Sequence, residues 1–539
     1  MAVIAGALAI PHISYISVLP ELIAMGAPMV MLLWSATTRS GGPGRWTAFT
    51  VVASVAAFLA SVEIWVKVGT HPYTAVAGAI LVDRFSAFLS GIFAVAMGLF
   101  ALLAHDWAVR EDESGPELPA LGMLSASGAM LMAAAGDLVV VFLGLEIMSI
   151  ALYVMAAMNR RRLASGEAAL KYFVLGAFSS AIFLYGIALT YGATGTTNIA
   201  RIASYLASNV VVSNGVLLAG MAMLIVGLGF KVAAVPFHTW SPDVYQGSPS
   251  PVTAFMSAVA KAAGFAALVR VLMEAMGTLR LDWQPAIYVL AVLSLVVGGI
   301  LTVVQRDVKR MLAYSSISHA GFVLAALQSA SAAGRSALAY YVAAYTLMII
   351  GSFAVAGHVG GPGDRSQDLS SYRGLSSRHP AVGFAFTILL LGQAGAPFTT
   401  GFLAKFYVVS AAVGNGSYTL AVVAMLSAVV TAFFYLRIVL GLYGSEEPST
   451  PEGPPGVLEP QPALVGSVGE PQASHGAEER GSVVVPEVLV AASATQVIEV
   501  SEVGAGTSVV LALCAAATVV LGVWPSPLLD LAKAATIIF

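Results

Sequence analysis

The chain has 539 residues, of which 58% are hydrophobic and only 10% are charged, and its mean hydropathy is +0.87. Soluble proteins carry about 25% charged residues, so this composition excludes a soluble enzyme, a disordered protein and a nucleic-acid-binding protein. It favours an all-α polytopic membrane protein, because each span needs about 20 mostly apolar residues. A β-barrel is not expected, since the apolar stretches are continuous rather than alternating.

The net charge of −3 conceals an uneven distribution. Residues 444–506 contain ten Glu, one Arg and neither Asp nor Lys, so this segment carries −9 and the remainder +6. It is rich in Pro, Gly, Ser and Val, and we expect a mostly disordered insertion without transport chemistry. The one cysteine, Cys514, excludes intrachain disulfides and iron–sulfur clusters held by cysteines of this chain. The apolar start at 1–10 lacks a basic region, so no cleaved signal peptide is expected.

Apolar stretches of suitable length predict fourteen membrane spans. In chain order they lie near 15–36, 47–66, 78–104, 119–135, 137–158, 168–191, 214–236, 251–276, 285–304, 308–329, 336–358, 380–413, 418–443 and 507–528.

Two of these spans contain features that interrupt a helix. The twelfth is too long for one simple span and contains Gly395, Pro397 and Gly401, while the seventh contains Pro236 five residues after Lys231. Proline removes a backbone donor, and broken membrane helices often mark transport sites. On these residues alone, an ordinary proline kink without a role in transport is an equally good explanation.

The order of the spans predicts a domain organisation. Helices 1–3 occupy 1–118, a first five-helix repeat (helices 4–8) occupies 119–276, and a second (helices 9–13) occupies 285–443. The acidic insertion covers 444–506 and helix 14 covers 507–539. Each repeat carries one broken helix, number 7 or number 12. Because five is odd, the second repeat must be inverted relative to the first, which is a transporter design.

The distribution of basic residues predicts the topology. Arginine and lysine concentrate in alternate loops, at 39–45, 110, 160–162, 306–310 and 365–378, and are fewer in the others. The positive-inside rule places the first set on the cytoplasmic side. Both termini of a multi-pass protein in the cell inner or plasma membrane are then expected outside, with the acidic insertion in the cytoplasm.

Ionisable residues persist inside the predicted spans, although each costs about 2.5–3.5 kcal/mol at a helix centre on insertion scales. They are Glu146, Lys171, Lys231, Lys261, His319 and Lys405. Lysines could instead extend to the interface, and this alternative is strongest for Lys171, near the start of its span. Glu146 could form a structural ion pair, and His319 could be a neutral, hydrogen-bonded core residue.

These residue types are suited to proton transfer. Burial favours neutral lysine, whereas a nearby carboxylate favours the charged form, so a carboxylate can switch its partner. The pair we expect is Glu146 with Lys171 or Lys231. Histidine titrates near neutral pH without help, and His238, at the cytoplasmic end of the seventh span, is either a proton-uptake group or an interfacial residue.

Other sites receive no support from the sequence. It contains no glycine-rich nucleotide-binding loop and no haem-attachment motif, and its histidines lack metal-ligand spacing. Arg437 is a weaker candidate that could simply reach the interface, and Asp137, at the start of the fifth span, is expected to be an exterior cap or an exit-side polar group.

Four segments resemble subunit N of the respiratory NADH:quinone oxidoreductase (complex I), whose mitochondrial counterpart is subunit 2. They are GLEIMSIALY at 144–153, EAALKYFVLGAFSS at 167–180, FKVAAVPFHTWSPDVYQG at 230–247 and YSSISHAG at 314–321. The resemblance covers roughly 15–443 and 507–530. The acidic insertion is the departure from the family pattern.

The resemblance implies an antiporter-like, proton-pumping subunit of a translocase, with no redox centre or cofactor of its own. Its partners would be the other membrane-arm subunits and the lipid bilayer, without nucleic acid or direct NADH binding.

The resemblance also assigns roles to individual residues. Glu146 and Lys231 match the paired residues of the first half-channel, and Lys171 matches a residue toward the lateral route. Lys261 matches the central linking lysine, Lys405 the exit-side lysine, and His238 and His319 histidines of the hydrated axis.

Two other functions remain open at this point. A subunit of a multi-subunit cation/proton antiporter would share the fold and many motifs but would move sodium without a redox partner. A purely structural membrane subunit would pump nothing, although five costly charges inside the spans argue against it.

Overall fold

The computed structural model describes residues 14–38, 42–209, 214–444 and 502–535. The expected disordered insertion lies almost entirely outside the described residues, as does the apolar start at 1–10.

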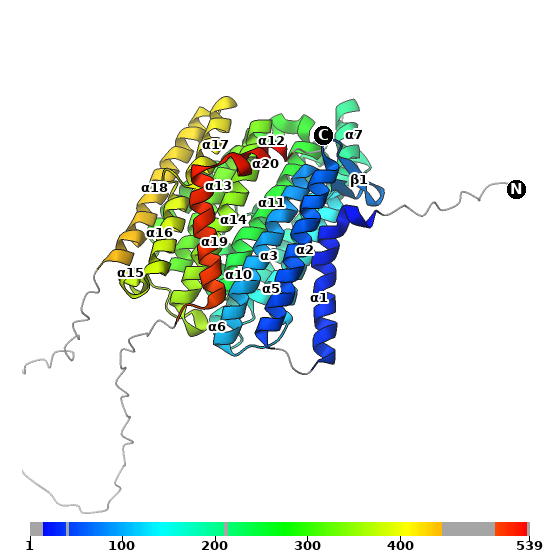
Figure 1. The fold of residues 1–539 in the computed structure, drawn as a ribbon. Coiled ribbons are helices and arrows are strands. Elements are labelled where there is room, and N and C mark those ends of the chain that lie inside the picture. The colour runs from blue at the N-terminus through cyan, green and yellow to red at the C-terminus, as the bar shows by residue number, and fades with distance from the viewer. Residues whose placement is uncertain (1–13, 39–41, 210–213, 445–501, 536–539) are drawn as a thin grey trace, which may run out of the picture. The chain divides into compact units, whose positions relative to one another are not determined.

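The described residues are largely helical, as the composition predicts (Figure 1). The α-helices are α1 (Leu19–Thr37), α2 (Pro43–Val68), α3 (Arg84–Glu111), α4 (Glu117–Ala134), α5 (Leu138–Ala156), α6 (Leu163–Thr194), α7 (Ile199–Ser208), α8 (Asn214–Lys231), α9 (Trp240–Gly247), α10 (Ser250–Phe255), α11 (Lys261–Leu268), α12 (Arg280–Val303), α13 (Val308–Gln328), α14 (Ala332–Gly360), α15 (Leu375–Arg378), α16 (Pro380–Ala394), α17 (Thr400–Gly414), α18 (Tyr418–Tyr443), α19 (Ala505–Val523) and α20 (Ser526–Ala534). Short 3-10 helices are η1 (Tyr15–Val18), η2 (Val76–Gly78), η5 (Gly277–Leu279), η6 (Pro362–Asp364) and η7 (Leu369–Tyr372).

Twelve helices among the described residues are long and apolar enough to cross a membrane. The chain is therefore a polytopic membrane protein. Three further helices correspond to predicted spans: α13 has 21 residues, and α16 and α17 have 15 each.

Both helix breaks occur in the predicted regions. α8 ends at Lys231, five residues earlier than the predicted end, and turns lead from there to α9. Ala233 has a positive φ of 58°, which the α-helix excludes. α16 ends at Ala394 with Gly395 in the left-handed region, where glycine is favoured, and α17 begins at Thr400.

The predicted start of the third span is also wrong. The third span was expected from residue 78, but α3 begins at Arg84 because a small antiparallel hairpin of β1 (Tyr73–Ala75) and β2 (Ile80–Val82) precedes it. Asp83 caps the helix by accepting a hydrogen bond from the Ser86 amide at 2.8 Å. A strand of only three residues leaves no periodic signal in the sequence.

The predicted eighth span is one helical path with two π-helical segments. η3 (Met256–Ala260) and η4 (Val269–Ala275) flank α11, so the continuous segment runs through Ser250–Ala275, and all of its residues except the partly buried Met273 are buried. Such π segments are rare and are frequently found at functional sites.

The helix ends define two ends of the bundle. We call the end with the loops at 112–116, 157–162, 304–307 and 361–379 the basic end, and the end with 69–83, 135–137 and 276–279 the opposite end. A backbone bridge between Asp307 and Asp368 joins two loops of the basic end, and one between Ile80 and Ala135 joins two loops of the opposite end.

α14 lies inside the bundle and packs against α3, α10, α13, α16, α17, α19 and α20. α19 lies beside both α3 and α16, so a late segment of the chain joins its early and late helices (Figure 1). The Thr507 amide donates to Asp106 at 2.6 Å, which fixes the start of α19 against α3.

Candidate functional site

Lys231, the last residue of α8, is held by two hydroxyl groups. Its Nζ donates to Ser149 Oγ of α5 at 2.8 Å and to Tyr172 OH of α6 at 3.1 Å, and the side chain is only 3% exposed. The Tyr172 ring is stacked on Trp240 with 4.6 Å between centroids, which fixes the phenol. The ammonium therefore rests on neutral oxygens rather than on a carboxylate.

Glu146 lies one turn before Ser149 on α5 and interacts with Lys231 through charge. Its Oε1 atom is buried without a hydrogen-bond partner among the described residues. No ion pair within 4.0 Å joins Glu146 to Lys231 or to Lys171 in the part of the chain described here. Within the described chain, Glu146 thus forms neither of the two predicted ion pairs, and it acts on Lys231 only through its charge.

The alternative pairing of Glu146 with Lys171 is not present. Lys171 is 43% exposed and binds Glu167 at 2.7 Å and Asp243 at 2.9 Å. Asp243 also accepts from Arg310 at 2.6 Å. Lys171 lies near the start of α6, and its exposed ammonium binds one carboxylate a turn earlier in α6 and another in the short helix α9. The side chain therefore extends to the interface, as its position in the span allows.

Lys261 begins α11 directly after the first π segment. Its Nζ donates to Ser316 Oγ of α13 at 2.5 Å and lies 5.7 Å from the centroid of the Tyr245 ring. A small cavity separates this lysine from His319 and is lined by both residues, Ser316 and Tyr345. The structure therefore brings two of the predicted residues to one cavity between α11, α13 and α14.

His319 connects that cavity to a second set of polar side chains. Its Nδ1 lies 2.7 Å from Tyr341 OH and its Nε2 lies 3.2 Å from Tyr435 OH. Tyr435 donates to Gln393 Oε1 at 3.2 Å, and Gln393 donates to Ser352 Oγ at 2.6 Å. The buried network thus spans α13, α14, α16 and α18.

Lys405 lies at the break between α16 and α17. Its Nζ donates to the carbonyl of Ala394, the last residue of α16, at 2.8 Å and lies 5.2 Å from the Phe322 ring. The last carbonyls of a helix have no partner within it, so the break supplies the acceptor. His319 is close enough to both Lys405 and Lys261 to interact with them electrostatically.

His238 occupies the turns between α8 and α9 and is half-buried. Its Nδ1 is buried without a hydrogen-bond partner among the described residues, and the ring interacts electrostatically with Lys261.

A buried charge cluster was missed in the sequence. Arg270 of η4 is fully buried and donates to both oxygens of Asp83 at 2.7 and 2.8 Å and to Glu274 at 2.6 Å. The spacing of Arg270 and Glu274, four residues apart in a predicted span, is the signal that could have indicated it. Asp83 is remote in the sequence and gave no signal.

A second missed group lies near the basic end. Lys309 was assigned to a loop, but it is the second residue of α13, is fully buried, and donates to the Ser248 carbonyl at 2.6 Å and to Asp364 at 3.3 Å. Asp364 also accepts from the amide and hydroxyl of Ser250.

The other two polar residues named from the sequence have structural contacts. Asp137 caps α5 by accepting from the Val139 amide at 2.8 Å, as predicted. Arg437 is exposed and reaches the Val303 carbonyl at 3.5 Å. Over the described ranges no group of three or more His, Cys, Asp or Glu side chains could hold a metal ion.

Comparison with known proteins gives consistent results. The family described as NADH:quinone oxidoreductase/Mrp antiporter, TM, matches residues 135–431. The NADH-quinone oxidoreductase subunit N of Trichlorobacter lovleyi is 42% identical over 433 residues, covering 80% of this chain and 88% of that protein.

Solved structures agree on the fold. A chain of respiratory complex I from Thermus thermophilus with bound aureothin is similar with a TM-score of 0.73 and 28% identity, over 95% of this chain and 98% of that chain. A chain of the Mrp complex from Dietzia sp. has a TM-score of 0.78 but 21% identity, over 97% and 96% of the two chains, a likeness of fold alone.

Proposed function

Since the chain belongs to the NADH:quinone oxidoreductase/Mrp antiporter family and is an antiporter-like subunit N of the NADH-quinone oxidoreductase type, we propose that its buried Lys, Glu and His residues carry protons. The free energy would come from redox chemistry in other subunits of the complex. The proposed relay contains Glu146, Lys231, Lys261, His319 and Lys405, with His238 beside its central lysine.

One observation carries this proposal. Each of the three deeply buried lysines, Lys231, Lys261 and Lys405, donates to a neutral hydroxyl or carbonyl oxygen and forms no ion pair within the described chain. An ammonium held by a carboxylate is costly to deprotonate, because the carboxylate is left buried and alone. A lysine on neutral acceptors can release its proton and leave no buried charge behind.

Glu146 is suited to control the first lysine. It acts on Lys231 through charge without a direct hydrogen bond, so a small change in their separation changes how strongly the protonated lysine is favoured. If Glu146 moves away or becomes neutral, burial favours release of the Lys231 proton. The proton would pass to the neighbouring hydroxyls or to water, and then toward Lys261.

Lys171 has a different role in the proposal. Its exposed network with Asp243 and Arg310 lies close to the basic end, so it would exchange protons or fix local structure there rather than hold a midplane proton. His238 would mediate uptake toward Lys261. His319 and its tyrosines would connect Lys261 to Lys405, the proposed exit-side residue.

We extend the proposal to topology and partners. α13 and the pair α16–α17 would also cross the bilayer, giving fourteen spans in two inverted repeats, with the basic end in the cytoplasm and the opposite end outside the plasma membrane. The partners would be other membrane-arm subunits and lipid. The chain itself would hold no cofactor and would not bind NADH.

The proposal is tested with Lys261→Met and Lys405→Met in the whole complex, reconstituted in vesicles, with exposed Lys533→Met as the matched control. NADH oxidation and vesicle acidification are measured together. We expect fewer protons per NADH in both relay variants and an unchanged ratio in the control. An unchanged ratio in fully assembled relay variants would contradict proton transfer through this chain.

The same vesicles distinguish the cation/proton antiporter function. The fold similarity to the Mrp complex favours considering it, although at 21% identity this concerns the fold alone. Sodium flux that continues without NADH, and that Lys405→Met abolishes, would support the antiporter over the redox-driven subunit.

A further inference from the structure

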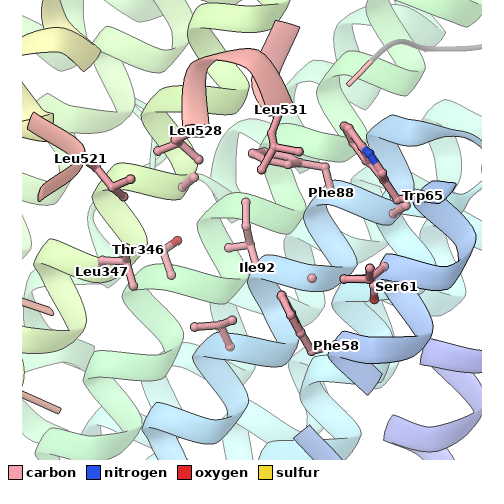
Figure 2. Close-up of a pocket in the computed structure, with 15 residues that line it drawn as sticks. Phe58, Ser61, Trp65, Phe88, Ile92, Thr346, Leu347, Leu521, Leu528 and Leu531 are labelled. Carbon is pink, nitrogen blue, oxygen red and sulfur yellow. The ribbon is translucent and has the colours of Figure 1, made fainter. Parts of the chain in front are cut away.

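An apolar cavity of about 310 Å³ lies between two pairs of helices (Figure 2). Phe58 and Trp65 of α2 and Ile92 of α3 form one wall, and Leu347 of α14 and Leu521 of α19 lie across from them. Leu528 and Leu531 of α20 close one end. The lining consists almost entirely of carbon, so the cavity favours a hydrocarbon occupant over water.

The rim of the cavity is open to the sides of the bundle. Phe58, Val62 and Val95 line it and are 39%, 43% and 38% exposed. They belong to α2 and α3, which are both long and apolar enough to cross a membrane. The cavity therefore opens on the side of the bundle and extends to its opposite end, where α20 lies.

Arg84 lies at that end, at the first residue of α3. Its guanidinium is 5.1 Å from the centroid of the Trp65 ring, and Trp65 lines the cavity. Among the described residues it forms no hydrogen bond or ion pair, and its Nε is buried without a partner. The adjacent carboxylate of Asp83 is occupied, because both its oxygens accept from Arg270.

The cavity and Arg84 together are complementary to the two parts of a phospholipid, its acyl chain and its phosphate. An apolar slot suits an acyl chain, and a guanidinium with free donors suits a phosphate, which it binds in a bidentate manner. Phe58 and Trp65 are seven residues apart on α2, so the slot extends about 10 Å along the helix axis.

We propose that this cavity binds one phospholipid, with an acyl chain between α2, α3, α14 and α19 and the phosphate on Arg84. The lipid would fill the space that the early helices and α14 leave open beneath α20. The site is separate from the proton relay, so this proposal stands independently of the proposed function.

Gly91 offers a way to fill the cavity without disturbing the fold. An added Cβ would lie 3.7 Å from the Phe58 ring, an ordinary contact. Gly91→Leu would thus occupy the slot, and Gly91→Ala is its matched control. Arg84→Gln removes the phosphate ligand, and Arg201→Gln, at an exposed residue of α7, is the control for charge.

The test uses the whole complex with each variant, reconstituted with phosphatidylglycerol that carries a photoreactive acyl chain. Diacylglycerol with the same chain serves as the probe that lacks phosphate. Labelled peptides are identified by mass spectrometry. We expect phosphatidylglycerol to label α2, α3 or α20 in the wild-type protein at least fivefold more than diacylglycerol.

The variants separate the two parts of the site. Gly91→Leu should abolish labelling by both probes, and Arg84→Gln should reduce phosphatidylglycerol labelling to the diacylglycerol level, while both controls match the wild type. Equal labelling in all variants would overturn the proposal. So would crosslinks from these peptides to a neighbouring protein chain in the wild-type complex.

Quinone is the other apolar molecule to examine. Thr346 lines the cavity with a buried hydroxyl that has no hydrogen-bond partner among the described residues, and it could bind a quinone oxygen. Quinone and phospholipid in the purified complexes are therefore quantified. Loss of bound quinone in Gly91→Leu and Thr346→Val, with phospholipid unchanged, would overturn the lipid assignment.

Discussion

Arg270 allows a quantitative test of the buried charge cluster. Arg270→Met removes the one ion-pair partner that Asp83 and Glu274 have among the described residues, and all three side chains are buried. Removing one member of a buried pair costs about 3–5 kcal/mol, because the other charge remains unpaired. Here one arginine serves two carboxylates, so we expect the loss to lie at the upper end of that range.

The matched variant is a triple substitution, Arg270→Met with Asp83→Asn and Glu274→Gln. It removes every charge of the cluster, and replacing a whole buried ionic group is often nearly neutral. Retention of the subunit in the purified complex after heating, measured by size exclusion, should fall sharply for Arg270→Met and recover for the triple variant. Equal stability of Arg270→Met and wild type, or no recovery in the triple variant, would refute the reasoning.

Three further outcomes follow from the geometry. Tyr172→Phe removes one of two hydroxyl acceptors of Lys231, so proton yield should fall less than in Lys231→Met, measured in the vesicle assay. Gly401→Ala places a Cβ against a backbone carbonyl of α16 and should reduce the amount of assembled complex, whereas Gly414→Ala, with open space, should not. Hydrogen bonds from the amide and hydroxyl of Ser370 hold the pKa of Asp368 below its ordinary value of 3.8. The ionised Asp368 carboxylate therefore stabilises the fold above pH 3.8, and this stabilisation is lost as the pH falls through the lower pKa of the folded state. Heat-denaturation curves should separate Asp368→Asn from wild type at pH 7 but not at low pH.

The sequence predicts the spans well because membrane helices are governed by length and apolarity. The regions of both helix breaks were also predicted, since proline and glycine act locally on the backbone. The bounds were less accurate. α8 ends at Lys231 because the turn begins at Ala233, three residues before the proline that was expected to end the helix.

Side-chain partners were harder to predict than backbone breaks. The hydroxyls of Ser149 and Tyr172, on two other helices, accept hydrogen bonds from Lys231. Ser and Tyr are so common in the chain that the sequence does not show which of them contact this lysine. The same applies to one of the two acidic partners of Lys171. Its carboxylate, Asp243, lies 72 residues away, and only the fold brings the two together.

The two broken helices share a physical feature that connects them to the lysines. Lys231 is the last residue of α8, and Lys405 donates to the last carbonyl of α16. Lys231 is thus the C-terminal residue of one helix segment, and the Lys405 ammonium binds a carbonyl at the C-terminal end of another, where the helix dipole provides partial negative charge.

Partial charge has a different consequence from a carboxylate. A helix end carries about half an elementary charge, which stabilises a buried ammonium less strongly than a full carboxylate charge does. When the lysine becomes neutral, no full charge is left buried without a partner. A continuous helix from α16 into α17 would satisfy the Ala394 carbonyl internally and would leave Lys405 without this acceptor. In the proposed relay, the break between α16 and α17 would therefore help Lys405 to release its proton, and restoring a helical path across this break should reduce proton yield even with the lysine intact.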